Sequence, residues 1–440
     1  MNREGCTYRM KLNIKRTALV GLAFMAIQSF WGLYDFTVPL ILKDTYGLQD
    51  TASGVVMAMD NVVALVLLPL FGSLSDRCNS PMGRRMPFLL GGAAAAAVLM
   101  LMVPMVIRSA ALPVFLGLLA LLLIIMGTFR SPTVALMPDV TPRHLRSSGN
   151  AIINLMGAVG SALTLVLINF LVIRTTGADG QTVSDYTWLF VTVAVEMVVC
   201  ALTVKLTIPE RKLAAEAEAI DARMHVQEDS PVEQSRRLTG PEMRSLVLLL
   251  CSVSLWFMGY NAITTAFSKY AMVTWHVTEA TAANCVLVAT VAAIASYWPV
   301  GLMSSRFGRK RMILTGLTVM VLCFLVGTLE REMNLLAYVM FVGVGMGWAS
   351  IGVNSYPMVV ELASGSDVGK YTGYYYTFSM AAQVLTPILS GALLEHVGYW
   401  TLFPYALVMM SCALVTMSLV RHGDSKPRAK RGLEALDVED

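Results

Sequence analysis

Four charged side chains lie inside long apolar stretches of this sequence: Asp35, Asp60, Arg130 and Glu196. On insertion scales a charge at the centre of a lipid bilayer costs at least ~2.5–3.5 kcal/mol, so such a residue usually faces a partner or a polar cavity. A carboxylate there can take up and release a proton, and an arginine can pair with a carboxylate or an anion. These residues are therefore the first candidates for chemistry.

Asp35 and Asp60 are expected to lie at similar depths in two consecutive helices. With a rise of ~1.5 Å per residue, each lies about 10–12 Å from the same, outer end of its helix. Two carboxylates that share a site of low dielectric constant cannot both ionise easily, so one of them should hold a proton near neutral pH. We interpret the pair as proton-coupling residues. For Asp60, a hydrogen bond between helices as part of an Asp-Asn pair is the alternative.

Arg130 begins the string RSPTVALMPD in a later apolar stretch, nearer the opposite end of its helix. At this depth we expect that it does not reach Asp35 directly unless the helix breaks. It is a third coupling candidate, through a carboxylate partner or through direct contact with a ligand. The alternative is a long side chain that extends to the membrane edge.

Aromatic and amide side chains follow single faces of several apolar stretches. Gln28, Trp31 and Asp35 repeat at helical spacing, and Tyr375 and Gln383 share one face of a later stretch. Rings flanked by a few polar groups are typical of small-molecule sites, although packing is the commoner role of any single aromatic residue. The ligand-binding candidates are Gln28, Trp31, Tyr34, Asn150, Asn154, Trp256, Tyr260, Asn261, Asn354, Tyr375 and Gln383.

The elements that carry these residues are apolar runs of about the ~20 residues that a membrane-spanning helix needs. Hydrophobic residues make up 56% of the chain and charged residues only 14%, against about 25% charged residues in soluble domains. The sequence predicts an all-α membrane protein with twelve transmembrane helices. Their expected ranges are 17–42, 52–72, 87–107, 111–137, 149–173, 186–208, 243–270, 281–303, 312–329, 334–360, 371–394 and 401–420.

Lysine and arginine are concentrated in the tails and in alternate loops. If the N-terminus is cytoplasmic, the external loops and helix ends hold only Lys43, Arg108, Arg174, Lys269 and Arg331. The positive-inside rule therefore predicts a multi-pass protein of the cell membrane (inner or plasma membrane) with both termini in the cytoplasm. The basic start without a small-residue cleavage site predicts a retained first helix rather than a signal peptide.

The two halves of the chain resemble each other. The string GSLSDRCNSPMGRR (72–85) follows the second predicted helix, and GLMSSRFGRKR (301–311) follows the eighth. RSSG (146–149) opens the fifth helix, and KYTG (370–373) opens the eleventh. Because each half has an even number of helices, the halves should be parallel six-helix repeats with a ligand site between them near the membrane midplane.

Four parts follow from this pattern. They are an N-terminal six-helix half (1–208), a cytoplasmic linker (209–242), a C-terminal six-helix half (243–420) and a cytoplasmic tail (421–440). The linker is charged and has few large apolar residues, so we expect it to be at most partly helical.

Signatures of an enzyme are missing from the sequence. The seven cysteines are spaced neither as a disulfide set nor as a zinc site. Nucleotide-binding and hydrolase motifs are absent, and the net charge of +4 gives no reason to expect nucleic-acid binding. We expect no enzymatic activity, no metal and no cofactor, and only membrane lipid and a small-molecule solute as partners.

A family resemblance rests on two segments. The string SDRCNSPMGRRMPF (75–88), with its weaker copy after the eighth helix, resembles the Major Facilitator Superfamily. Together with ALMPDVTPRHLRSSGNA (135–151), it resembles the sucrose-transporter group of the glycoside–pentoside–hexuronide cation symporters. This resemblance implies proton-coupled sugar uptake, with sodium as the other possible coupling ion, and a monomer is adequate for the fold. The plant members carry an acidic residue in helix four, whereas LLALLLIIMGTF (118–129) has none.

Charged residues also gather where helices end on the predicted cytoplasmic side. We expect them to pair across the two halves and to close the cytoplasmic side in one conformation; the alternative is a simple positive-inside anchor. These gate candidates are Asp76, Arg77, Arg84, Arg85, Arg306 and Arg309.

The function expected from the sequence is proton-coupled symport of a glycoside or small sugar by alternating access. A proton-driven exporter of amphipathic small molecules is the alternative, because it would use the same fold and the same carboxylates. A transporter-like sensor is disfavoured, because the linker and the tail are too short for a folded signalling domain.

Overall fold

The computed structural model describes residues 12–109, 111–142, 145–176, 182–225, 238–362 and 368–423. Twelve helices in these ranges are long and apolar enough to cross a membrane, which confirms the predicted fold class. They are α1 (Ile14–Asp44), α2 (Asp50–Asp76), α3 (Met86–Ser109), α4 (Leu112–Asp139), α5 (Arg146–Leu171), α6 (Thr187–Thr207), α8 (Gly240–Thr274), α9 (Glu279–Phe307), α10 (Arg309–Leu329), α11 (Leu335–Glu361), α12 (Val368–His396) and α13 (Leu402–Leu419). Most of the predicted tail, residues 424–440, lies outside the described residues.

Polar caps extend several helices beyond the apolar cores that the sequence marks. The helix predicted at 243–270 begins at Gly240, because Thr239 and Glu242 form a reciprocal capping box there. The helix predicted at 281–303 begins at Glu279, since the Thr278 side chain accepts a hydrogen bond from the backbone N–H of Thr281.

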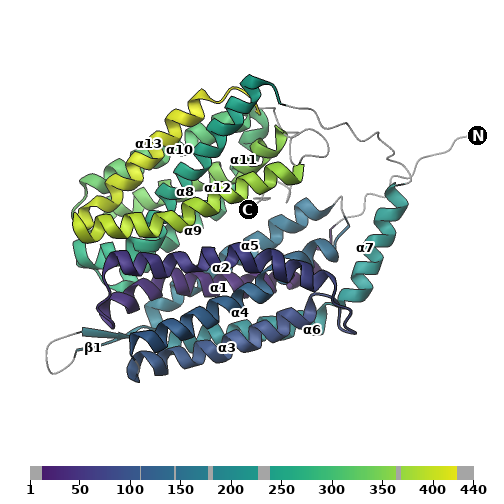
Figure 1. Cartoon of the computed structure of the whole chain (residues 1–440), viewed down its shortest axis with the longest axis horizontal. Helices are drawn as coiled ribbons and strands as arrows, with labels where there is room; N and C mark the ends of the chain where they lie inside the picture. The colour runs from purple at the N-terminus through teal and green to yellow at the C-terminus, as the bar shows by residue number, and fades with distance from the viewer. Residues whose placement is uncertain are drawn as a thin grey trace, which may run out of the picture.

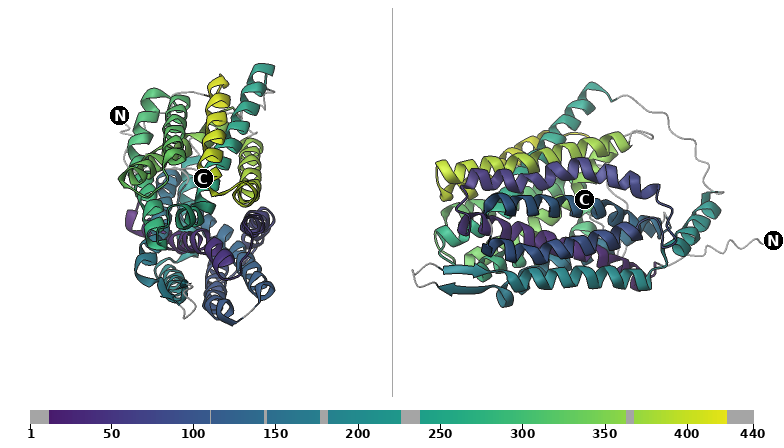
Figure 2. Two further views of the ribbon diagram at one scale, coloured as in Figure 1. Left: turned by 90° about the vertical axis from the view of Figure 1, so that its left-hand side faces the viewer. Right: turned by 60° about the horizontal axis from the view of Figure 1, so that its bottom comes forward.

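The helix contacts of the two halves repeat each other. In the N-terminal half, α1 packs on α5 and α6, α4 packs on α2 and α3, and α3 packs on α6. In the C-terminal half the equivalent helices make the same contacts: α8 with α12 and α13, α11 with α9 and α10, and α10 with α13. The contacts between the halves are paired in the same way, α2 with α12 and α9 with α5. The two groups of helices are visible in Figures 1 and 2.

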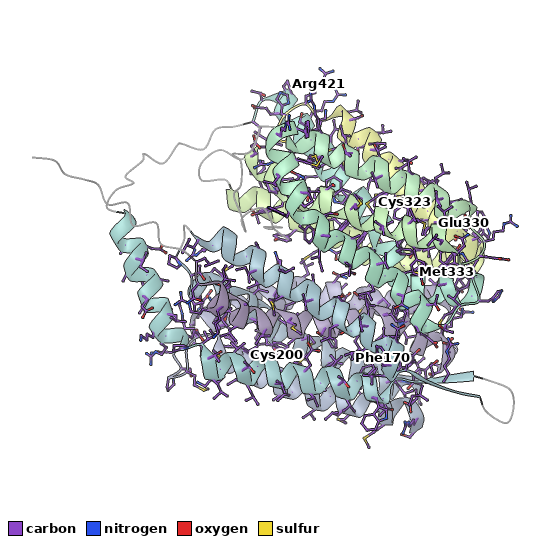
Figure 3. The ribbon with its side chains drawn as sticks, turned by 180° about the vertical axis from the view of Figure 1, so that it is seen from behind. Phe170, Cys200, Cys323, Glu330, Met333 and Arg421 are labelled. Atoms are coloured by element: carbon purple, nitrogen blue, oxygen red, sulfur yellow. The ribbon has the colours of Figure 1, made fainter. Side chains whose placement is uncertain are left out.

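The two ends of the bundle differ. At one end, β1 (Ile173–Thr176) and β2 (Thr182–Asp185) form an antiparallel hairpin between α5 and α6, which the sequence analysis did not predict. Helix α7 (Glu210–His225) lies at the opposite end, toward which the two halves diverge (Figure 1). Figure 3 places Glu330 and Met333 at the first end and Arg421 at the second. We call these the hairpin end and the linker end.

The linker helix α7 is docked on the N-terminal half. The Glu210 carboxylate accepts hydrogen bonds from the backbone N–H groups of Arg84 (2.6 Å), Arg85 (2.9 Å) and Met86 (3.0 Å) at the start of α3. Gly83 makes this approach possible, because it has a φ of +122° and a Cβ there would lie 2.1 Å from Glu210. The predicted linker is therefore partly helical, as expected; its residues 226–237 lie outside the described residues.

Candidate ligand cavity between the halves

Two connected lobes of a cavity lie between the halves. Lobe A has a volume of about 310 Å³ and lobe B about 320 Å³, each near the lower end of the ~300–1,000 Å³ range of small-molecule sites. Both lobes are lined by the same five residues, from α1 and α8: Gln28, Trp31, Asp35, Asn261 and Thr264. All of these except Thr264 were predicted from the sequence.

Lobe A is rich in amide and hydroxyl groups. Asn154 and Ser161 of α5 line it on one side, and Tyr260 and Ser268 of α8 line it on the other. Asp35 is the one acidic or basic side chain among its lining residues. The ring of Tyr260 stacks on Trp348 at 3.7 Å between centroids with an interplanar angle of 5°. Apart from Asp35, this lobe offers an uncharged polar surface backed by aromatic rings.

Lobe B holds the charged candidates together. Asp35, Asp60 and Arg130 all line it. Asn61 donates a hydrogen bond to Asp60 at 2.7 Å, within α2 itself rather than between two helices. The guanidinium of Arg130 lies 5.3 Å from the centroid of the Trp31 ring, which is cation–π geometry. Arg130 and Asp35 therefore line the same lobe, although the arginine was expected nearer the opposite end of its helix. The expectation that the two do not touch directly stays a prediction.

Several polar atoms of the cavity lining, two in the shared part and one in lobe A, lack a hydrogen-bond partner. The indole N–H of Trp31, the amide nitrogen of Asn261 and the hydroxyl of Ser268 are all buried without one. A buried polar group left unpaired costs about 1–3 kcal/mol. Ligand oxygens that accept these hydrogen bonds would relieve that penalty.

Seven of the eleven predicted ligand-binding residues line the cavity, and four do not. Trp256 and Tyr34 are buried in the helix packing. Asn354 accepts a hydrogen bond from Ser304 and donates one to the Ser350 carbonyl, so it joins α11 to α9. Asn150 lies on α5 outside both linings. The seven that line a lobe are Gln28, Trp31, Asn154, Tyr260, Asn261, Tyr375 and Gln383.

A row of hydroxyl groups on α8 was not predicted from the sequence. Thr264, Thr265 and Ser268 follow Asn261 at helical spacing, and each lines one or both lobes. Their spacing could have identified them. Hydroxyl residues are common in transmembrane helices, however, where they often bond to their own backbone, as Thr264 and Thr265 do to the Asn261 carbonyl.

Four of the six predicted gate residues, Asp76, Arg84, Arg85 and Arg309, form ion pairs at the linker end, each within one half. Arg85 contacts Asp139 at 2.7 Å and also pairs with Asp76. In the other half Arg309 pairs with Glu361. The halves are apart at this end in the present conformation (Figure 1), so pairing across the halves in a state closed at this end stays a prediction. The remaining side chains are more exposed: Arg84 lies 3.9 Å from Asp139, and Arg77 and Arg306 are open to solvent.

Polar contacts between the halves gather instead at the hairpin end. Lys269 of α8 pairs with Asp50 of α2 at 2.7 Å. Asn169 of α5 and Asn284 of α9 exchange two hydrogen bonds of 2.9 and 3.0 Å. A small cavity that Asp50 and Lys269 line shares Met57 with lobe B. The hairpin end is therefore closed over lobe B.

Within the described ranges, no group of three or more His, Cys, Asp or Glu side chains is arranged so that it could hold a metal ion. The charged groups of lobe B are two carboxylates and one guanidinium, a set suited to moving a proton or binding a polar solute.

One protein family matches nearly the whole length of the sequence. The family model described as Major Facilitator Superfamily matches residues 20–274 and 248–438, and so includes both six-helix halves. Among curated proteins, 114 residues of the chain are 27% identical to the chloramphenicol resistance protein CraA of Acinetobacter baumannii. That match spans 26% of this chain and 27% of CraA.

Solved structures share the fold at low sequence identity. The nucleoside transporter NupG, in a mutant form, has a TM-score of 0.66 and 13% identity, with 93% of this chain and 100% of that chain covered. The peptide transporter POT in complex with sulfate gives 0.65 and 14%, covering 92% and 93%. A bacterial homologue of the human lysosomal transporter Spinster, inward-facing and occupied, gives 0.61 and 14%, covering 93% and 95%.

Proposed function

The chain belongs to the Major Facilitator Superfamily, and we propose that it is a secondary active transporter that takes up a glycoside or another small sugar together with protons. The observation that supports this proposal is the set of chemical groups that line the cavity. A lobe of uncharged amide and hydroxyl groups joins, through Trp31 and Asp35, a lobe that contains two carboxylates and an arginine.

The orientation in the membrane is part of this proposal. The positive-inside pattern of lysine and arginine supports a cytoplasmic linker end and an external hairpin end. The polar contacts at the hairpin end and the divergence of the halves at the linker end then correspond to an inward-open state (Figure 1).

The proposed coupling uses Asp35, Asp60 and Arg130. In a closed cavity of low dielectric constant, Arg130 can neutralise only one of the two carboxylates. A proton on the other carboxylate removes the remaining negative charge, and so favours passage of the halves through the closed state. When the cavity opens to the cytoplasm, water re-enters and the proton can leave. Protonation of one carboxyl group is thereby linked to alternating access.

The sugar would occupy the surface shared by both lobes. Its C–H faces suit the rings of Trp31 and Tyr260, and its oxygens suit the free donors of Trp31 and Asn261. The guanidinium of Arg130 also disfavours a sodium ion at the two carboxylates, because two cations would then repel each other in one small lobe. A proton meets no such repulsion once it forms a neutral carboxyl group.

Proton-driven export of amphipathic molecules is the second candidate. The partial similarity to CraA favours it, and an exporter could use the same carboxylates in exchange for its cargo. The amide and hydroxyl lining of lobe A favours a polar solute instead, because an amphipathic cargo would leave those groups unpaired.

Solute uptake into proteoliposomes tests the proposal. We expect radiolabelled sugar from a panel of mono- and disaccharides to accumulate when an acidic exterior is imposed. Asp35→Asn should reduce accumulation at least about tenfold, which corresponds to ~1.4 kcal/mol of lost coupling. Glu196→Gln is the matched control, since this carboxyl group accepts a hydrogen bond from the Ser29 hydroxyl and lines neither lobe. Uptake of no sugar, together with export of an amphipathic cation, would favour the second candidate.

A further inference from the structure

A buried ion pair joins the two halves at the hairpin end. Lys269 of α8 donates to Asp50 at 2.7 Å, and Tyr399 donates to the other carboxylate oxygen of Asp50 at 2.5 Å. Lys43 donates in turn to the Tyr399 hydroxyl at 2.6 Å. The side chains of Lys269 and Asp50 are only 4% and 10% exposed. A buried pair of this kind is stable only while both partners stay together.

The position of this pair relates it to the cavity. Asp50 and Lys269 line a small cavity of about 10 Å³ whose other lining residues include Met57, Thr265 and Pro387. These three residues also line lobe B. The ion pair therefore lies between lobe B and the surface at the hairpin end.

The β1–β2 hairpin makes a second connection between the halves. Arg174 on β1 forms an ion pair with Glu279, the first residue of α9, and Ser184 on β2 donates a hydrogen bond to the same carboxylate. The Glu279 side chain is only 3% exposed. The hairpin thus extends from the N-terminal half and binds the C-terminal half.

A third set of contacts fixes the hairpin to its own half. Asp185 on β2 pairs with Arg108 of α3 at 2.6 Å and accepts a hydrogen bond from the backbone N–H of Thr187 at 2.9 Å. Burial alone would raise the pKa of Asp185, but these hydrogen bonds and the arginine lower it overall. The two strands continue directly from α5 and into α6, so the chain itself keeps the hairpin with the N-terminal half, and the exposed Arg108 pair adds little. Movement of the halves must therefore break the contacts to Glu279.

We propose that these contacts form a gate with two clasps, Asp50–Lys269 over lobe B and Arg174–Glu279 at the hairpin, and that together they hold the hairpin end closed in this conformation. When the hairpin end opens, water can reach all four charges, so the open state does not leave unpaired buried charge. Removal of either clasp should then shift the population toward opening at the hairpin end and closure at the linker end. The proposal depends on the two-half fold and not on the identity of the solute or the coupling ion.

Distances between pairs of spin labels test this gate. One pair of labels is placed at Gln49 and Val397 at the hairpin end, and another at Asn79 and Arg311 at the linker end; all four side chains are exposed. The labels are attached to a variant whose seven native cysteines are replaced. Electron–electron distance measurements are made in lipid nanodiscs at neutral pH without solute.

The variants remove one clasp at a time. Asp50→Asn/Lys269→Gln removes both charges of the buried pair, and Glu279→Gln leaves only Arg174, which solvent can reach. We expect each variant to raise the ratio of the long to the short distance at the hairpin end at least about tenfold, with the opposite change at the linker end. Arg108→Gln is the matched control, because it breaks an ion pair of the same hairpin within one half, and it should leave both distances unchanged.

A charge reversal distinguishes loss of the ion pair from loss of folding. Glu279→Arg alone should open the hairpin end, and Glu279→Arg combined with Arg174→Glu should return the distance to that of the unmodified protein. An unchanged distance at the hairpin end in either clasp variant would overturn the proposal. An equal shift in Arg108→Gln would also overturn it, since general loosening of the hairpin would then explain the data. Failure of sugar transport with the expected distance changes would refute the proposed function alone.

Discussion

At the scale of single residues, the chemistry depends on a few charges in lobe B. Asp35 and Asp60 come from α1 and α2, and Arg130 reaches them from α4. The arginine lies against the ring of Trp31, a residue that both lobes share. A change in the charge or position of Arg130 can therefore affect both lobes.

Substitution of Arg130 tests its role in coupling. Arg130→Gln should lower proton-driven uptake at least about tenfold, because closure of the cavity would then bury two carboxylates that have no positive partner. Arg130→Lys keeps the charge but loses the planar contact with Trp31, so uptake should fall less. The measurement is initial uptake under an imposed pH gradient, with Arg311→Gln, an exposed arginine of α10, as the control. Equal activity in all variants would contradict a coupling role.

The free amide donor of Asn261 gives a prediction about affinity. Asn261→Ala should weaken solute binding about two- to tenfold, since a hydrogen bond contributes about 0.5–1.5 kcal/mol. Asn354→Ala removes an amide that joins α9 and α11 outside the cavity, so it should lower stability and leave affinity unchanged. Binding is measured by calorimetry on the purified protein. Weaker binding in Asn354→Ala but not in Asn261→Ala would mean that the solute binds outside this cavity.

At the scale of secondary-structure elements, the linker helix α7 supports the charge cluster of the N-terminal half. Glu210 binds three N–H groups at the start of α3, next to the Arg85 side chain that holds Asp76 and Asp139. The start of a helix favours a negative charge, so α7 completes this end of α3. The linker is thus a structural part of the N-terminal half.

Removal of that carboxylate should destabilise the protein. Glu210→Ala leaves three buried or half-buried N–H groups without an acceptor, and hydrogen bonds to a charged group contribute about 1.5–3 kcal/mol. We expect the free energy of unfolding to fall by about 2 kcal/mol, measured by denaturant or thermal unfolding in detergent. Glu216→Ala, on the exposed side of the same helix, is the control. Equal stability of both variants would mean that α7 is not docked.

At the scale of the whole molecule, long apolar runs were enough to predict twelve helices, and the repeated strings at 72–85 and 301–311 were enough to predict two similar halves. Residues that lie on one helix face with Trp31, such as Gln28 and Asp35, were found because helical spacing defines a face. Contacts between helices were harder to predict. The long side chain of Arg130 brings it into lobe B, and the partner of Lys269 lies 219 positions away in the sequence. Such contacts depend on how the halves meet, which no local pattern records.

The central claim is that one cavity couples a sugar to protons, and proton entry driven by the sugar alone tests it most directly. The protein is placed in liposomes that contain a pH dye, with equal pH on both sides and the sugar added outside. We predict internal acidification that depends on the sugar, is lost in Asp35→Asn and persists in Glu196→Gln. Sugar entry without any acidification would contradict the account.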